Sequence, residues 1–478
     1  MGARLDEALL RRVIETPERI CAVDQDGAAI TFRALWDASS SLAARLEEGR
    51  VAQGLSACGV GVLADTSVGG LIAYIACLQA RVAYVPLDAL APPSLLEAQA
   101  AACLESVCLC TLVCDRSSAS PAERLAAATE LPLIRLNSLG WEHGTSSAGV
   151  KRPAAFPVSS TNSRGADTND TAHVIFTSGT SSGRPRAVLT DHTASLLSHA
   201  WRWPLGSPAA HGAQDLASAD DSAAFGDGTK GVVVGCGIFG LWDATAALLA
   251  GDGSVAALLS REVLRDASSL ASAVQTLHSV VRLGITRLLL TPSLLVVRLG
   301  ITRLLLTPSL LAAMLASPEA VLALRRLRTL VLCGEPLSAG GSAAAFAALH
   351  QQAIFNLYSS CECGDVDPSG EAALSSPPGA PGKRAADLSD AGAGGAPAPS
   401  LLPRVTLVGR GGSGRILVSG PGLAIGYGAS DASGRFREVR VVETPGGGGR
   451  VVRVFVTDDV GVLGEGGRVA VVGRCEVA

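Results

Sequence analysis

Residues 176–186 read FTSGTSSGRPR, an apolar strand end that passes into a loop of small and hydroxylated residues and closes on Arg186. A loop of this kind offers several backbone N–H groups and hydroxyls to an anion, with a positive charge beside them. It is not the GxxxxGK(S/T) loop of the Walker type, because no Gly-Lys-Ser/Thr follows. The stretch therefore predicts a polyphosphate-binding loop that follows a β-strand.

On either side of this loop, two kinds of sequence pattern alternate. Apolar β-type runs, such as GVGVLA at 59–64 and LRTLVLC at 327–333, alternate with Ala/Leu-rich helical patterns such as SVGGLIAYIACLQA at 67–80. After about Pro368 the chain changes to Gly/Pro-rich linkers between short strands. The pattern predicts parallel sheets covered by helices, an α/β fold, followed by a smaller β lobe.

Three segments interrupt this alternation, and one sequence occurs twice. The segments 142–170, 207–230 and 368–403 are predicted to be surface loops or disordered insertions. The run VVRLGITRLLLTPSLL occupies residues 280–295 and again 296–311. Two copies are too few for a solenoid. Because two identical elements cannot occupy the same slot in a sheet, one copy must be expelled, form an extra element or distort the lobe. We expect the second copy, which leads into a helical pattern, to hold the normal place.

Composition limits the class of protein. The chain has 478 residues, 48% hydrophobic and 17% charged, with a net charge of −4, which is typical of globular proteins. The absence of a basic surplus, with only 4% aromatic residues, argues against nucleic acid as a partner. The twelve cysteines lack paired CxxC spacing, which favours buried thiols in a reducing compartment over a zinc site.

The N-terminus and one apolar run bear on the compartment. The start, MGARLDEALLRRVIE, carries charges where a signal peptide has its apolar core, so a cytoplasmic protein is expected. Residues 231–250 are apolar, but their glycine content and Asp243 fit a buried strand and helix better than a membrane span.

The loop at 176–186 resembles TSGTTGxPKG, the phosphate loop of the adenylate-forming superfamily, which includes acyl-CoA synthetases, luciferases and nonribosomal peptide adenylation domains. Two departures are visible: Ser181-Ser182 makes the loop one residue longer, and Arg186-Ala187 replaces Lys-Gly. ITFRAL at 30–35 and AYVPLD at 83–88 resemble two further segments of that superfamily. The resemblance implies that phosphate is bound by Thr177, Ser178, Gly179, Thr180, Ser181, Ser182, Gly183 and Arg186.

Two later motifs resemble the segments around adenine. VLCGEPL at 331–337 resembles the strand-to-loop segment that borders the base, which places Gly334 and Glu335 there. NLYSSCE at 356–362 is similar to NxYGxTE, so Tyr358 would lie against adenine and Cys361 would replace a hydroxyl near the α-phosphate. Glu362 would hold Mg²⁺, for which a carboxylate is a suitable hard ligand.

The last motifs lie near the C-terminus. GRILVSGPGLAIGY at 414–427 resembles GELxxxGxGLAxGY, and the TDD at 457–459 resembles TGD. By that resemblance Asp459 accepts hydrogen bonds from the ribose hydroxyls and Arg474 reaches the ribose or a phosphate. His192 occupies a place where the superfamily commonly has a histidine, and a buried core histidine is an equal reading of it.

The resemblance implies a fold and a domain plan. The fold is two αβα lobes plus a small β-barrel-like lobe, with the superfamily's small C-terminal domain and its lysine absent from the sequence. The large AMP-binding domain would cover 1–475, with α/β lobes at 1–366 and a mainly β lobe at 367–475, and 476–478 would be a stub of the hinge. The nearest relatives would be acyl-activating enzymes related to the β-alanine-activating enzyme.

The implied activity is attack of a carboxylate on the α-phosphorus of Mg-ATP, which gives an acyl-adenylate and then a thioester. Thr180, Arg186 and Glu362 would be catalytic, with Mg²⁺ on Glu362 and Thr180. The thiol acceptor would be coenzyme A or a carrier-protein phosphopantetheine. The acid pocket would lie around 237–251, where Ile238 replaces the usual ammonium-binding Asp and Asp243 follows a turn later, which disfavours an α-amino acid.

Two other functions stay open. A non-catalytic nucleotide-binding module is suggested by the missing lysine domain, by Arg186 and Cys361, and by the longer phosphate loop. An adenylation-domain fragment of a nonribosomal peptide synthetase would require a carrier domain beyond the missing region and an ammonium-anchoring acid in the pocket.

Overall fold

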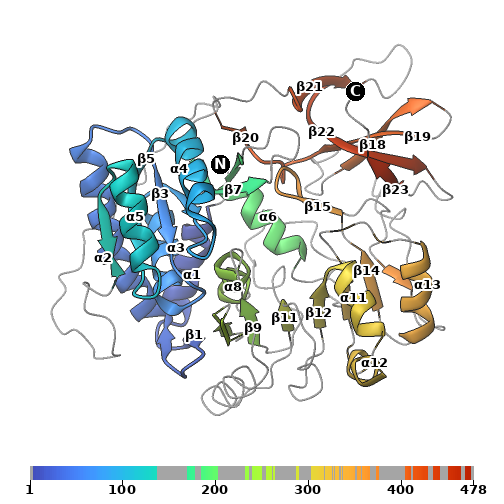
Figure 1. Ribbon diagram of the computed structural model, residues 1–478, viewed down its shortest axis with the longest axis horizontal. Helices are drawn as coiled ribbons and strands as arrows, with labels where there is room; N and C mark the ends of the chain where they lie inside the picture. The colour runs from blue at the N-terminus through green and yellow to red at the C-terminus, as the bar shows by residue number, and fades with distance from the viewer. Residues whose placement is uncertain are drawn as a thin grey trace.

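The structure is a computed structural model of the chain (Figure 1). It describes residues 4–136, 170–177, 185–202, 232–235, 240–249, 255–260, 262–263, 287–289, 303–316, 318–325, 327, 329–332, 335, 337, 339–349, 353–356, 358–366, 373–375, 404–410, 413–428, 434–441, 450–463 and 469–474.

A seven-stranded sheet, in the order β20-β8-β7-β4-β3-β5-β6, organises the N-terminal lobe at the left of Figure 1. The central strands pair in parallel, whereas β8 pairs antiparallel with both β7 and β20. The strands are β3 (Gly59–Leu63), β4 (Ala83–Pro86), β5 (Leu109–Cys114), β6 (Leu133–Arg135), β7 (Thr171–Thr177), β8 (Arg186–Asp191) and β20 (Gly426–Tyr427).

Both faces of this sheet are buried, which explains its uninterrupted apolar strands. Along β4, Ala83 and Val85 join the core with α4 and α5, whereas Tyr84 joins the core with α2 and α3. The alternation follows from the two-residue period of a strand. The helices of this lobe are α1 (Leu5–Glu15), α2 (Phe32–Ala52), α3 (Val68–Gln79), α4 (Pro93–Val107) and α5 (Ala119–Thr129).

Helix α3 packs between two sheets and is apolar all round. Its residues from Gly70 to Leu78 are buried, and it contacts β3 and β4 on one side and β1 and α8 on the other. Ser67 caps it by accepting a hydrogen bond from Gly70 N at 3.0 Å. A side chain at Gly70 would meet Asp65 O at 2.4 Å, so the close approach requires glycine.

A nine-stranded sheet forms the second lobe, in the order β17-β14-β13-β12-β11-β9-β10-β1-β2. The middle strands are parallel, and each edge pair is antiparallel. The strands are β1 (Ile20–Asp24), β2 (Ala29–Thr31), β9 (Val232–Gly235), β10 (Val255–Leu258), β11 (Arg287–Leu289), β12 (Arg303–Leu306), β13 (Thr329–Leu332), β14 (Ala353–Asn356) and β17 (Ala373–Ser375). The remaining helices are α6 (His192–Arg202), α8 (Gly240–Leu249), α11 (Pro308–Leu315), α12 (Pro318–Leu324) and α13 (Ala339–Ala348).

The two copies of the duplicated run lie side by side in this sheet. Strand β11 comes from the first copy and β12 from the second, and they pair in parallel with Arg287 opposite Arg303 and Leu289 opposite Leu305. Of the three outcomes expected from the sequence, the structure has the extra element. As expected, the second copy leads into a helix, α11.

The structure tests the predictions for residues 368–403 and 231–250. The sequence predicts a loop over 368–403, but Ala373–Ser375 form the edge strand β17, because the edge of β14 offers backbone partners to any short extended segment. The rest of 368–403, like 207–230 and 142–169, lies outside the described residues. The strand and helix predicted within 231–250 are confirmed as β9 and α8.

The C-terminal strands form an antiparallel sheet in the order β18-β19-β22-β21, with β23 on β22 (Figure 1). The lobe is mainly β, as predicted. In the described part of the chain, however, its sheet is open and does not close into a barrel. Its strands are β18 (Arg404–Arg410), β19 (Ser413–Ser419), β21 (Phe436–Val441), β22 (Arg450–Leu463) and β23 (Val469–Arg474). A separate hairpin, β15 (Tyr358–Ser360) with β16 (Gly364–Val366), shares a small core with it.

Among the described residues, no helix combines the length and the hydropathy that crossing a membrane requires. These residues contain no group of three or more His, Cys, Asp or Glu side chains arranged for a metal ion. None of their nine cysteines is in a disulfide, and seven of these side chains are buried, as small apolar side chains are.

Candidate functional site

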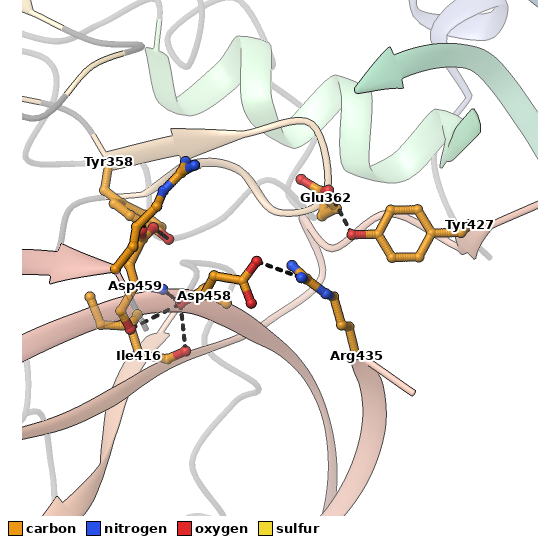
Figure 2. A network of polar contacts seen from close by, with 9 residues as sticks. Tyr358, Glu362, Ile416, Tyr427, Arg435, Asp458 and Asp459 are labelled. Carbon is orange, nitrogen blue, oxygen red and sulfur yellow. Dashed lines mark hydrogen bonds and ion pairs between the residues drawn. The ribbon is translucent and has the colours of Figure 1, made fainter. Parts of the chain in front are cut away.

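Residues from three predicted motifs meet between the β15–β16 hairpin and the β lobe (Figure 2). Tyr358 of β15 donates its hydroxyl to Asp459 Oδ2 of β22 at 2.5 Å. Arg474 of β23 donates Nε to Asp459 Oδ1 at 3.2 Å. The second contact follows from strand pairing, because Asp459 and Arg474 are direct cross-strand partners. Three residues predicted to bind adenine and ribose therefore share one hydrogen-bonded cluster.

A bulge in β22 presents the TDD motif. Along β19, Arg415 pairs with Val460 and Leu417 with Val456, so residues 457–459 face Ile416 alone. Thr457 stabilises the bulge, because its hydroxyl donates to Ile416 O at 2.9 Å and accepts from Asp459 N at 3.1 Å.

The two carboxylates on this bulge have different partners. Asp458 forms an ion pair with Arg435, while Asp459 faces Tyr358 (Figure 2). The bulge changes the direction of the strand locally, so the neighbouring side chains of Asp458 and Asp459 point toward different partners.

Glu362 lies in the turn that joins β15 and β16. Ser360 pairs with Gly364 across a three-residue loop, and Gly364 has a φ of 65°, a left-handed conformation that glycine adopts without strain. The Glu362 side chain is buried, and Oε1 accepts a hydrogen bond from the Tyr427 hydroxyl at 2.7 Å. Among the described residues no hydrogen bond to Oε2 is seen, so that oxygen can serve as a ligand for Mg²⁺.

Among the described residues, Glu362 is the single carboxylate predicted to bind Mg²⁺. Mg²⁺ in proteins is commonly held by one or two carboxylates, with water and substrate phosphates completing its shell. Glu362 fits that pattern, whereas the described residues contain no preformed cage. Thr180, the other predicted ligand, lies outside the described residues.

The phosphate loop is attached to the same region. Thr177 ends β7, Arg186 begins β8, and the two residues face each other across the antiparallel pair. The predicted phosphate-binding residues between them, Ser178, Gly179, Thr180, Ser181, Ser182 and Gly183, lie outside the described residues. The guanidinium carbon of Arg186 lies 5.7 Å from the centre of the Tyr427 ring, within the range of a cation–π contact.

Cys361 precedes Glu362 in the turn, and burial raises the pKa of its thiol to about 12. The side chain is therefore neutral at physiological pH. As a thiol it is a weaker hydrogen-bond partner than the hydroxyl that the resemblance places here.

Glu335 is occupied by a contact that the sequence did not predict. Its two carboxylate oxygens accept hydrogen bonds from Ser309 N and Ser309 Oγ, both at 2.9 Å, at the start of α11. An acidic side chain at a helix N-terminus is favourable because it satisfies backbone N–H groups there. Gly334 lies outside the described residues, so the predicted border of the adenine site remains a prediction.

His192 is a core residue. It begins α6, is 2% exposed, and its Nδ1 lies 3.8 Å from Asp6 Oδ1. Burial, with the nearby charge of Arg4, lowers its pKa well below the usual value, so the ring is neutral. In the acid pocket predicted around 237–251, Ile238 and the side chain of Asp243 lie outside the described part.

Two site residues were not assigned a role from the sequence. Tyr427 appeared only as the last letter of GPGLAIGY, and Arg435 lies in no recognised motif. A signal for Tyr427 existed, because the chain has only four tyrosines and three of them, Tyr84, Tyr358 and Tyr427, fall in the quoted motifs. For Arg435 the sequence held no signal, since its partner Asp458 is reached across the sheet.

Comparison with known protein families gives one match. Residues 9–226 match the sequence profile of the family described as AMP-binding enzyme.

Curated relatives align with parts of the chain. It is 26% identical over 364 residues to glycine betaine reductase ATRR of Emericella nidulans, an alignment that covers 75% of this chain and 24% of that protein. It is 28% identical over 175 residues to surfactin synthase subunit 2 of Bacillus subtilis, which covers 37% of this chain and 4% of that protein. The chain therefore spans about a quarter or less of the length of these relatives.

Solved structures share the fold over nearly the whole chain. The N-terminal subdomain of Klebsiella oxytoca NpsA in complex with 3-hydroxybenzoyl-AMSN has a TM-score of 0.64 at 17% identity, covering 99% of this chain and 100% of that one. NpsA-ThdA, an artificially fused adenylation–PCP di-domain from Klebsiella oxytoca, has a TM-score of 0.64 at 19% identity, covering 99% and 79%. At these identities the likeness concerns the fold.

Proposed function

Because the chain belongs to the adenylate-forming superfamily, whose AMP-binding profile matches residues 9–226, we propose that it activates a carboxylic acid with ATP. A carboxylate oxygen attacks the α-phosphorus, pyrophosphate leaves, and an acyl-adenylate forms. Transfer of the acyl group to a thiol, of coenzyme A or of a carrier-protein phosphopantetheine, is the second step of the proposal.

The observation that carries this proposal is that two residues of one motif, Tyr358 and Glu362, are hydrogen-bonded to residues of two later motifs (Figure 2). Tyr358 bonds to Asp459, and Glu362 bonds to Tyr427. Asp459 is held by two donors and can accept further hydrogen bonds from the ribose, since each carboxylate oxygen has two lone pairs. The Tyr358 ring offers a flat face for adenine beside it. Glu362 would hold Mg²⁺, which supplies positive charge to the phosphates as negative charge shifts in the transition state.

The residues 178–183 and Arg186 would then surround the leaving pyrophosphate. Backbone N–H groups in a Gly/Ser/Thr loop suit the phosphate oxygens, and Arg186 adds a planar cation at its end. We also take 1–475, with a division near 366, as the proposed extent of the AMP-binding domain.

A second candidate is an adenylation domain that works within a nonribosomal peptide synthetase. It is favoured by the likeness to surfactin synthase subunit 2 and to tyrocidine synthase 3 of Brevibacillus parabrevis, at 28% and 26% identity. A carrier protein would then be the thiol-bearing partner. Pyrophosphate exchange and thioester formation on an added carrier protein, compared with coenzyme A, would separate the two candidates.

Calorimetric titration of the full chain with Mg-ATP and with AMP tests the proposal. We expect both nucleotides to bind, and Asp459→Ala to weaken each by about tenfold to a hundredfold, since a hydrogen bond to a charged group contributes about 1.5–3 kcal/mol. The matched control is Asp458→Ala, which removes the neighbouring carboxylate and its ion pair with Arg435. The proposal is wrong if the folded wild-type chain binds neither nucleotide, or if both variants bind as the wild type does.

A further inference from the structure

Tyr427 contacts two charged residues of the candidate site, Glu362 and Arg186, through different parts of its side chain. Its hydroxyl donates to Glu362 Oε1 at 2.7 Å, and its ring lies 5.7 Å from the guanidinium carbon of Arg186. Figure 2 shows the hydroxyl end of Tyr427 directed at the Glu362 carboxylate. One side chain thus touches the proposed magnesium ligand and the cation that closes the phosphate loop.

The backbone around Tyr427 is held on two sides. Tyr427 pairs with Val188 of β8, and Gly428 N donates to Ala187 O at 3.0 Å, directly after Arg186. In the same segment, Ala424 N donates to the Glu362 carbonyl at 2.9 Å. Backbone hydrogen bonds on both sides of Tyr427 therefore connect the segment that begins at Arg186 with the turn that holds Glu362.

The ring itself is also fixed. It packs edge-on against Phe436 with 5.5 Å between ring centres and an interplanar angle of 73°. Phe436 in turn lies under the guanidinium of Arg453 at 4.8 Å. A side chain packed in this way loses little further freedom when it makes a hydrogen bond, so its hydroxyl is pre-positioned.

A phenol suits this place chemically. It gives the Glu362 carboxylate one neutral hydrogen bond, which orients the group without cancelling its charge. The contact uses Oε1 and leaves Oε2 for a metal. The ring face meanwhile attracts the Arg186 guanidinium through its quadrupole.

We propose that Tyr427 is a positioning residue that orients Glu362 toward Mg²⁺ and ties the metal site to the Arg186 end of the phosphate loop. The inference rests on the proposed function. Tyr427 would act through Glu362 and Arg186 and would not touch the α-phosphorus itself. Its effect should therefore appear in the binding of a metal–triphosphate and not in the binding of a nucleotide that lacks the β- and γ-phosphates.

The test measures two affinities on the full chain, for Mg²⁺ with α,β-methylene-ATP and for AMP without metal. Tyr427→Phe keeps the ring and removes the hydroxyl, and we expect it to weaken the metal–triphosphate about tenfold, the loss typical of one hydrogen bond to a charged group. AMP affinity should stay within about twofold, because no contact of the base or ribose changes. Tyr427→Leu, which also removes the ring contact with Arg186, should weaken the triphosphate further.

A double variant separates positioning from a general structural effect. In a Glu362→Gln background, Tyr427→Phe should cause no further loss of triphosphate affinity, because the two residues act through one interaction. Tyr84→Phe is the control for loss of a buried phenol in the same lobe. Melting temperatures of all variants identify any that fail to fold.

The outcomes are distinguishable. If wild-type protein binds neither ligand, the proposed function itself is wrong and this inference falls with it. If the wild type binds both and Tyr427→Phe leaves triphosphate affinity unchanged, weakens AMP equally, or adds its full effect to Glu362→Gln, only the inference about Tyr427 is overturned.

Discussion

Asp24 ends β1 with its carboxylate half-buried against the start of α3. Its Oδ1 accepts a hydrogen bond from Val68 N at 2.7 Å, but burial raises the pKa of the group to about 7, and the nearby Asp26 and Asp65 add to the rise. Burial outweighs the backbone hydrogen bond because an ionised carboxylate loses more hydration than one N–H group replaces.

This shift predicts a pH-dependent stability. With a folded pKa near 7 and an unfolded pKa near 3.9, the folded chain binds the proton more tightly, so stability from this group is lost as pH rises through about 7. Asp24→Asn should therefore raise the free energy of unfolding at pH 8 by a value of the order of 2 kcal/mol, an amount discounted for partial exposure. At pH 4 the gain should nearly vanish.

Denaturant unfolding at both pH values measures this difference. Glu48→Gln, at an exposed position of α2, is the control and should change stability little at either pH. An equal gain for Asp24→Asn at pH 4 and pH 8 would show that the carboxylate is not the cause.

At the scale of elements, the duplicated strand shows how a sheet accepts an insertion. Strand β11 pairs with β9 through Arg287 and Leu288, and β12 pairs with β13 through the same Arg-Leu-Leu residues of the second copy. Parallel strands pair in an evenly spaced pattern, so an identical strand fits beside its copy in the same register. Each copy thus supplies one strand, with β11 against β9 and β12 against β13.

Deletion of residues 280–295 should therefore leave a folded protein with an eight-stranded second sheet. Arg303 and Leu304 would replace Arg287 and Leu288 against β9, with identical side chains at the new interface. We expect a melting temperature no lower than that of the full chain and an unchanged far-UV circular dichroism shape. A deletion variant that aggregates or melts earlier would show that β11 has become necessary for the sheet.

At the scale of the whole molecule, the site lies between bodies that have separate cores. The β lobe and the β15–β16 hairpin share one small core, whereas the N-terminal helices and strands form two larger ones. Arg186 belongs to β8 in the seven-stranded sheet, while Asp459 belongs to β22 in the five-stranded one. A nucleotide bound to both would therefore connect two bodies.

This arrangement predicts that heating unfolds the β lobe first. All five tryptophans precede residue 250, so their fluorescence reports the N-terminal lobes, whereas far-UV circular dichroism reports every element. Without ligand the first dichroism transition should come at a lower temperature than the fluorescence transition. Mg²⁺ with α,β-methylene-ATP at about 100 times its Kd should stabilise the β lobe by about 2.7 kcal/mol and bring the transitions together.

Asp459→Ala, at the same ligand concentration, is the control for that experiment and should keep the transitions apart. Coincident transitions without ligand would contradict the separate unfolding of the lobes. Separate transitions that do not move with ligand would contradict a site shared between them.

Sequence alone determined the alternation of strands and helices, the later change to a mainly β lobe, and the motifs that carry the candidate site, because these depend on local periodicity and residue type. It also predicted Tyr358, Glu362, Asp459 and Arg474 as site residues, and the structure brings Tyr358, Asp459 and Arg474 into direct contact. Their roles toward a nucleotide, and the domain boundaries at 366 and 475, stay predictions.

Only the tertiary structure decided what depends on contacts between residues far apart in the chain. The pairing of Tyr427 with Glu362, of Asp458 with Arg435 and of Glu335 with Ser309 joins segments 65, 23 and 26 positions apart. The inclusion of both copies of the repeat in one sheet, and of Ala373–Ser375 at its edge, likewise came from backbone partners that no local pattern encodes. Local sequence sets which element forms, whereas hydrogen-bond partners across a sheet are chosen by the fold as a whole.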